Sequence, residues 1–142
     1  MQKKITAIRM LVYATLFLSV YFYPFTSAFK VHAADLFEVE NALICEEISN
    51  STPVKQAVVF SNSRERIYCY TQLDKVKEHS VIYHNWYKRD SLSSRRKLIV
   101  KPPRWRTYSS IQLRDYDNGP WKVEITDSEG NVLKTLRFSI LD

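Results

Sequence analysis

The sequence predicts an all-β protein. Its single domain, residues 34–142, is expected to be an immunoglobulin-like antiparallel β-sandwich that follows an N-terminal signal peptide. Three observations predict this fold. Short runs rich in Val, Ile, Tyr, Phe, Trp and Thr alternate with polar or Pro/Gly breaks, helical periodicity is almost absent, and the chain after the leader holds seven or eight such runs. Many short strands separated by turns are typical of two packed sheets, and a small β-barrel is the alternative.

Residues 1–33 have the three parts of a secretory signal. The start is basic without an acidic residue, and the stretch from Met10 to Phe25 is mostly apolar. The following V-H-A places small residues where a signal peptidase cuts, so we expect cleavage after Ala33, with Ala28 as second choice. The apolar stretch is about 16 residues long, short of the roughly 20 that a spanning helix needs. We therefore expect an exported protein of the periplasm or cell envelope; anchoring in the inner membrane by an uncleaved leader is the alternative.

Removing the leader removes most of the positive charge. Four of the 21 basic residues and none of the 15 acidic residues precede residue 34, which leaves 17 basic against 15 acidic residues. This small excess gives little support to nucleic-acid binding. No second long apolar run follows the leader, so we expect membrane attachment only through an uncleaved leader.

Two cysteines, Cys45 and Cys69, follow the leader. Exported proteins meet an oxidising compartment, where an even number of cysteines suggests a disulfide bond. Both lie in strand-like runs that can pair, so we expect a Cys45–Cys69 disulfide; two buried free thiols are the alternative. Two cysteines without C-x-x-C spacing supply too few metal ligands, and we expect neither a metal nor another cofactor.

Period-two alternation defines the strands. It is clearest near the C-terminus, where Trp121, Val123 and Ile125 alternate with polar residues before a D-S-E-G turn. Gly130, near the end of that turn, fits a hairpin with one residue at positive φ. The predicted strands cover residues 42–48, 56–60, 66–73, 80–88, 92–101, 105–113, 121–126 and 131–141.

The order of several motifs resembles a known family. H-N-W-Y, P-R-W-R-T-Y-S-S, G-P-W-K-V-E-I-T-D-S-E-G-N-V-L and R-F-S-I follow one another as in the bacterial family called Domain of Unknown Function 2914, and A-L-I-C-E-E-I-S-N-S-T-P and R-I-Y-C-Y-T look similar too. The likeness covers residues 40–141 and implies an exported or membrane-attached envelope protein of a Gram-negative bacterium, with no assigned activity. The matching signature positions are His84, Trp86, Trp105, Arg106, Ser109, Ser110, Gly119, Trp121 and Gly130.

This sequence departs from the family's pattern at two positions. Ile111 follows the two serines where the family often has a lysine, which weakens any idea that a lysine there takes part in chemistry. Tyr70 stands where phenylalanine is common.

The motif P-R-W-R-T-Y-S-S gives the first candidate binding residues. As a strand it turns Trp105 inward and places Arg104, Arg106 and Tyr108 on the other face, with the two arginines about 7 Å apart. Two guanidinium groups at that spacing hold a carboxylate or phosphate, or each pairs with an acid on a neighbouring strand, such as Glu124. The second interpretation is favoured because cross-strand ion pairs are common.

Residues 80–88 give the second group. Alternation places His84 and Trp86 on one face, with Ile82, and Tyr83 and Tyr87 on the other. A histidine beside a tryptophan forms either an aromatic ligand platform or part of a sandwich core, and the core is the favoured interpretation.

Two other segments are polar without a specific motif. Residues 91–97, S-L-S-S-R-R-K, form a basic cluster, which is expected to be solvated because a phosphate patch needs aromatic residues and a wider extent. Asp115, Asp117 and Asn118 precede Gly119-Pro120 and favour a turn over a calcium loop.

Two functions follow from these residues. The first is a non-catalytic envelope module, not an enzyme, that binds a protein segment or a cell-wall or polysaccharide ligand. The second is a small periplasmic hydrolase that uses Ser109 or Ser110 with His84. It requires a serine oxygen within about 4 Å of an imidazole nitrogen. The sequence has no G-x-S-x-G elbow, so the first function is favoured.

Overall fold

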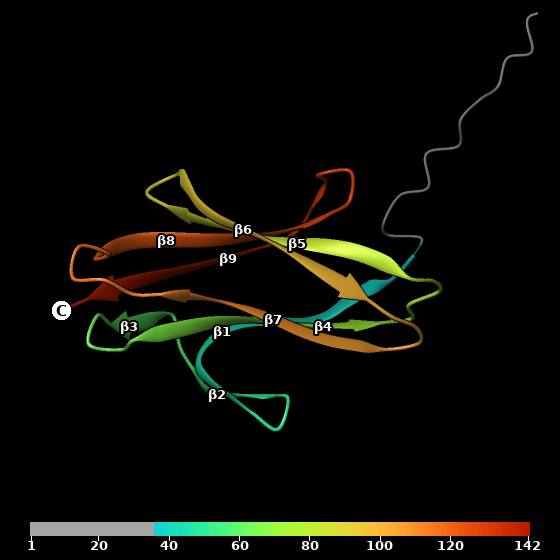
Figure 1. Cartoon of the computed structure of the whole chain (residues 1–142), viewed down its shortest axis with the longest axis horizontal. Coiled ribbons are helices and arrows are strands. Elements are labelled where there is room, and N and C mark those ends of the chain that lie inside the picture. The colour runs from blue at the N-terminus through green and yellow to red at the C-terminus, as the bar shows by residue number, and fades with distance from the viewer. Residues whose placement is uncertain (1–35) are drawn as a thin grey trace, which may run out of the picture. The chain divides into compact units, whose positions relative to one another are not determined.

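A computed structural model describes residues 36–142, and this part of the chain consists of strands and turns (Figure 1). The predicted all-β fold is therefore confirmed. The predicted signal peptide, residues 1–33, lies outside the described residues. The strands are β1 (Glu38–Ser49), β2 (Thr52–Gln56), β3 (Val59–Ser61), β4 (Arg66–Asp74), β5 (Ser80–Lys88), β6 (Ser91–Val100), β7 (Trp105–Gln112), β8 (Gly119–Asp127) and β9 (Val132–Leu141).

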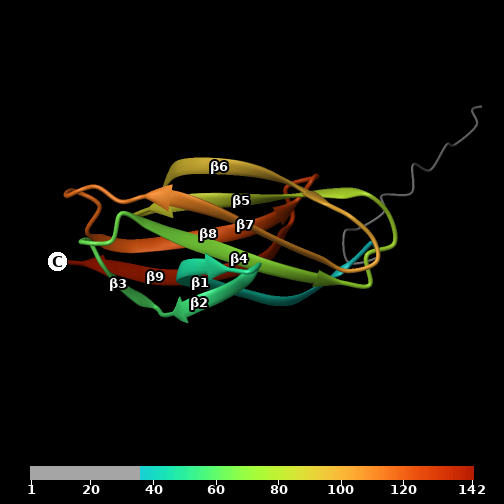
Figure 2. The same ribbon diagram turned by 60° about the horizontal axis from the view of Figure 1, so that its bottom comes forward.

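The strands form two stacked sheets (Figures 1 and 2). The four-stranded sheet has the order β2-β1-β4-β7, and the five-stranded sheet has the order β3-β9-β8-β5-β6. All neighbours are antiparallel except β3 and β9, which pair in parallel. Both sheets end in edge strands, so the sandwich is correct and the barrel alternative is wrong. Between residues 36 and 142 no helix has the length and apolar character needed to cross a membrane.

The core lies between the sheets and uses the faces that alternation predicts. Ile82 and Trp86 of β5 are fully buried, as are Val123 and Ile125 of β8. The ring of Phe138 on β9 packs edge-on against Trp86, with centroids 6.2 Å apart. Truncating a buried tryptophan typically costs about 3–5 kcal/mol, so the burial of Trp86 contributes substantially to the stability of the core.

Tight turns join neighbouring strands, and one of them was not predicted. Asn50 and Ser51 both have positive φ and form a two-residue hairpin turn between β1 and β2. The predicted first strand ends before this turn, and the next predicted run, residues 56–60, contains only the last residue of β2 and the first two residues of β3. Pro53 misled the prediction, although proline is tolerated on an edge strand such as β2. The D-S-E-G turn is confirmed, with Gly130 at φ 91°.

The predicted disulfide is wrong, because Cys45 and Cys69 are both free thiols. The two residues lie on neighbouring strands, but Cys45 is opposite Tyr68, and Cys69 is opposite Ile44. Directly opposite residues share a face, and adjacent residues alternate between faces. Cys69 therefore points into the core, whereas Cys45 points to the outer face of the same sheet. Burial raises the pKa of both thiols, which keeps them protonated.

Candidate functional site

A chain of buried hydrogen bonds joins the two sheets. His84 of β5 contacts Thr71 Oγ1 of β4 through Nε2 at 3.0 Å. Its Nδ1 lies 2.8 Å from Ser109 Oγ of β7. The indole Nε1 of Trp86 donates to the same Ser109 Oγ at 3.0 Å. We call Thr71, His84, Trp86 and Ser109 the inter-sheet network; it ties β5 of one sheet to β4 and β7 of the other.

The imidazole in this network is neutral. Burial lowers the pKa of His84 to about 3, because the charged ring would lose its hydration. Both ring nitrogens have hydroxyl partners, and a hydroxyl donates or accepts as the tautomer requires. The favoured core interpretation of His84 and Trp86 is therefore correct, with side chains instead of backbone satisfying the ring.

The two adjacent serines have different surroundings. Ser109 is 8% exposed and lies inside the network. Ser110 points to the outer face, where Arg66 donates to its Oγ at 3.1 Å. Only Ser109 meets the distance that a serine–histidine pair requires. The partner of the second imidazole nitrogen is Thr71, not a carboxylate.

Arg104 is held by an acid on the neighbouring strand. Its Nε and Nη2 donate to the two carboxylate oxygens of Asp74, each at 3.1 Å. The hydrogen bond from Arg104 lowers the pKa of Asp74. The predicted pairing with a neighbouring acid is therefore correct for Arg104 alone, and its partner is Asp74 and not Glu124. Arg106 is exposed beside Tyr108 on the same face and has no ion pair within residues 36–142.

The seven predicted binding residues do not form one surface. Arg104, Arg106 and Tyr108 lie on the outer face of the four-stranded sheet, as the alternation of β7 requires. Tyr83 and Tyr87 lie on the outer face of the five-stranded sheet, where Arg95 and Lys122 cover their rings. His84 and Trp86 are buried between the sheets. No single ligand contacts all three places.

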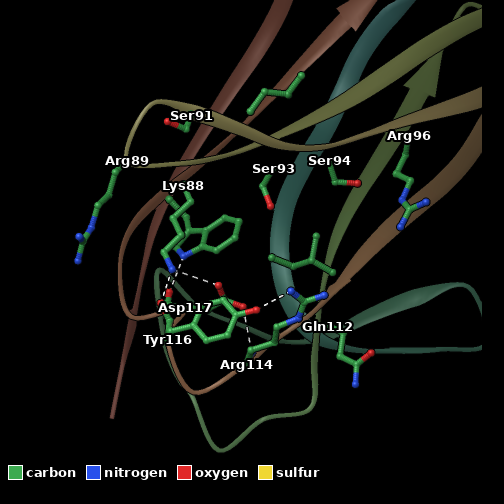
Figure 3. A pocket seen from close by; sticks show the side chains of 13 residues that line it. Lys88, Arg89, Ser91, Ser93, Ser94, Arg96, Gln112, Arg114, Tyr116 and Asp117 are labelled. Carbon is green, nitrogen blue, oxygen red and sulfur yellow. Dashed lines mark hydrogen bonds and ion pairs between the residues drawn. The ribbon is translucent and has the colours of Figure 1, made fainter.

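The structure instead has a cleft at the edge of the sandwich (Figure 3). At this edge β6 and β7 lie near each other (Figure 2). Its volume is about 700 Å³, which is in the range of ligand sites. Strand β6 forms one wall, and β7 with the loop before β8 forms the other. The edge cleft is lined by Lys88, Arg89, Ser91, Leu92, Ser93, Ser94, Arg96, Ile111, Gln112, Arg114, Tyr116, Asp117 and Trp121.

Tyr116 lies between two cations at this cleft (Figure 3). Its hydroxyl accepts from Arg114 at 2.6 Å, and the Lys88 ammonium lies 5.3 Å from its ring centroid. Lys88 also pairs with Asp117, at 3.2 Å, and donates to the Tyr116 carbonyl. Because Tyr116 is 66% exposed, it offers an aromatic surface to a ligand.

The turn before β8 holds this wall in place. Asp117 Oδ2 accepts from the backbone N–H of Arg114 at 2.9 Å, and the Asp117 carbonyl accepts from Trp121 Nε1 at 2.7 Å. Asp117 therefore organises a turn, as predicted. The absent Cβ of Gly119 leaves room for Arg89, because a Cβ there would lie 3.2 Å from its Nε.

The edge cleft and the inter-sheet network are neighbours. In the β5–β6 register, Ser94 is opposite Trp86, and Arg96 is opposite His84. Directly opposite residues share a face, so Ser94 and Arg96 continue the inner face of the sheet to the cleft wall. The network thus fixes the spacing between β5 and β7, and the cleft opens next to it.

Most of this cleft does not follow from the sequence pattern. The basic cluster of residues 91–97 is evident in the sequence, but its proximity to Lys88, Arg114 and Tyr116 is not. A signal was present in the charge order, because residues 88–114 contain nine basic residues and one acidic residue. The net charge of the chain concealed this segregation.

The comparison with known families agrees with the sequence resemblance. Residues 79–140, from just before β5 into β9, match the family described as Protein of unknown function (DUF2914). The matched segment contains both walls of the edge cleft. No curated protein matches the chain.

Replacing the network serine tests its structural role. Ser109→Ala leaves Trp86 Nε1 and His84 Nδ1 without a partner, and we expect a loss of about 2–5 kcal/mol in the free energy of unfolding. Ser110→Ala is the matched control and should change it by less than about 1 kcal/mol, because its contact is at the surface. Urea denaturation measures both. Equal effects of the two substitutions would contradict the network.

The neutral state of His84 predicts a pH dependence. An unfolded histidine has a pKa of about 6.5, so between about pH 6.5 and about pH 3 only the unfolded state takes up this proton. The free energy of unfolding should therefore fall as the pH falls, by up to about 1.4 kcal/mol per pH unit from this group. Urea denaturation should show a shallower slope for His84→Gln than for the wild type.

The exposed His79 provides the control for this experiment. His79→Gln should retain the wild-type slope, which separates the buried ring from a general effect of histidine removal. Identical slopes for the wild type and His84→Gln would mean that His84 is protonated in the fold.

Proposed function

We propose that this protein is a non-catalytic binding module of the bacterial envelope and that the edge cleft holds its ligand. The single observation that carries the proposal is a concave site of about 700 Å³ with cationic, hydroxyl and aromatic groups on its walls. The leader-like N-terminal sequence and the envelope location implied by the sequence resemblance support this proposal.

The charge of the edge cleft favours an anionic ligand. Lys88 is neutralised by Asp117, whereas Arg96 and Arg114 have no acidic partner within the residues that the structure describes. Guanidinium groups are suited to carboxylates and phosphates, which they bind with two parallel hydrogen bonds. A ligand that carries such groups therefore fits the cleft better than a neutral one.

The inter-sheet network supports binding over hydrolysis. A nucleophilic serine needs a base whose pKa is near the working pH, and burial holds the pKa of His84 at about 3. The Ser109 oxygen also accepts a hydrogen bond from Trp86 and is almost fully buried. These properties are those of a structural hydrogen-bond partner.

Nuclear magnetic resonance of the isotope-labelled protein tests the proposal. We expect polysaccharides released from the envelope of the producing bacterium to shift the amides of residues 91–96 and 114–117. Arg96→Gln/Arg114→Gln should abolish these shifts, whereas Lys55→Gln/Lys134→Gln, which removes two cations from strands β2 and β9, should retain them. Shifts confined to the outer sheet faces, or no shifts with envelope polysaccharides and peptides alike, would contradict the proposal.

One observation favours a second function, a serine hydrolase. Ser109 Oγ lies 2.8 Å from His84 Nδ1, within the reach of a general base. A fluorophosphonate probe labels activated serines, so a hydrolase should be labelled at Ser109 and lose the label in His84→Gln. The binding module predicts an unlabelled Ser109.

A further inference from the structure

We infer that the ligand of the edge cleft is an acidic polysaccharide, a sugar polymer with carboxylate or phosphate groups, which extends from the cleft along β6. This inference rests on the proposed function and names the ligand class of the same site. Three features of the described residues carry it: the distribution of charge, the polar groups on the cleft walls and the lack of an apolar anchor pocket.

Charge is strongly segregated in this fold. Residues 88–114, which contain β6 and β7, carry nine basic residues and one acidic residue. Residues 36–74, which contain β1 to β4, carry six acidic and three basic residues. Because β6 and β7 are edge strands on the same side of the sandwich, the positive charge gathers along that side.

The positive charge continues beyond the cleft along β6. Arg96 faces the cleft, whereas Arg95 and Lys97 face outward from the same strand. These three cations are consecutive residues and span about 7 Å, at roughly 3.3 Å per residue. Together with Arg89 and Arg114 at the cleft, they suit a ligand with repeated anionic groups better than a small anion.

The cleft walls also suit a polyhydroxylated ligand. Ser91, Ser93 and Ser94 from β6 and Gln112 from β7 line the cleft, and these side chains both donate and accept hydrogen bonds (Figure 3). The exposed Tyr116 ring supplies a flat apolar surface, and its position is held by Arg114 and Lys88. A sugar ring presents one apolar face and a rim of hydroxyls, so it matches this combination.

The apolar part of the cleft argues against a peptide. Peptide and protein ligands depend on aromatic or aliphatic anchors that enter desolvated pockets. At the cleft, Ile111 and Trp121 are only 8% and 5% exposed, so they offer little surface to such an anchor. Leu92 is 56% exposed, but this one accessible aliphatic side chain does not form a desolvated pocket. Single-stranded nucleic acid requires successive aromatic platforms, and Tyr116 is the one well-exposed aromatic ring among the residues that line the cleft.

Isothermal titration calorimetry with defined polymers tests the inference on the purified full-length protein. The probes are polygalacturonate, which carries carboxylates, phosphomannan, which carries phosphates, neutral dextran, poly-L-glutamate and oligothymidylate. We expect at least one acidic polysaccharide to bind at least about ten-fold more tightly than dextran, poly-L-glutamate or oligothymidylate. Its affinity should fall as the salt concentration rises from about 0.05 M to about 0.5 M.

Matched variants locate the interaction. Arg96→Gln/Arg114→Gln should weaken binding of the acidic polysaccharide by about ten-fold or more, because each substitution removes a charge-assisted hydrogen bond. Arg96→Gln alone, which leaves the Tyr116 contact intact, provides a second variant, and near-ultraviolet circular dichroism verifies the fold of each. Lys55→Gln/Lys134→Gln should change affinity by less than about two-fold.

The remaining outcomes separate this inference from the proposed function. Equal or tighter binding of poly-L-glutamate or oligothymidylate would overturn the inference and identify an acidic protein segment or a nucleic acid as the ligand class. If neither acidic polysaccharide binds while other ligands still shift the cleft amides, the inference fails and the proposed function stands. If nothing shifts the cleft amides, both fail.

Discussion

The hydrogen bonds that join the His84 imidazole and the Trp86 indole with hydroxyls of the opposite sheet set the geometry of this sandwich. Apolar packing alone tolerates sliding of one sheet over the other, because it has no direction. A buried series of hydrogen bonds does not tolerate such sliding, since each polar group left unpaired in the core costs about 1–3 kcal/mol. The network therefore fixes β5 relative to β7. The edge cleft follows from this constraint. One wall of the cleft is β6, which pairs with β5, and the other wall is β7 with the loop that follows it.

Most of the fold was predictable because alternation is a local signal. Once one residue of β5, β7 or β8 is assigned to the core, alternation assigns the inner and outer faces of the whole strand. The structure confirms these faces. Contacts between strands were harder to predict, since they depend on the register in which the strands pair. The predicted Cys45–Cys69 disulfide failed because a one-residue offset places the two side chains on opposite faces. The β1–β2 hairpin was missed because Asn50 and Ser51 form its turn without a glycine.

The candidate site was less predictable, because it is assembled from segments that the sequence separates. Arg96 lies on β6, Arg114 and Tyr116 follow β7, and Lys88 ends β5. Only the pairing order of the strands brings them to one edge. The predicted binding residues came from single strands, and period-two alternation then divided them between opposite faces of the sandwich. Net charge also concealed the site, because acids of the first strands balance the cations of β6 and β7.

We propose that the edge cleft is where this protein binds an anionic ligand. A crystal structure of the protein grown with a short galacturonate oligomer is the decisive measurement. We expect carboxylates at the guanidinium groups of Arg96 and Arg114 and a sugar ring against Tyr116. An oligomer bound on the outer face of either sheet, with the cleft left to solvent, would contradict it.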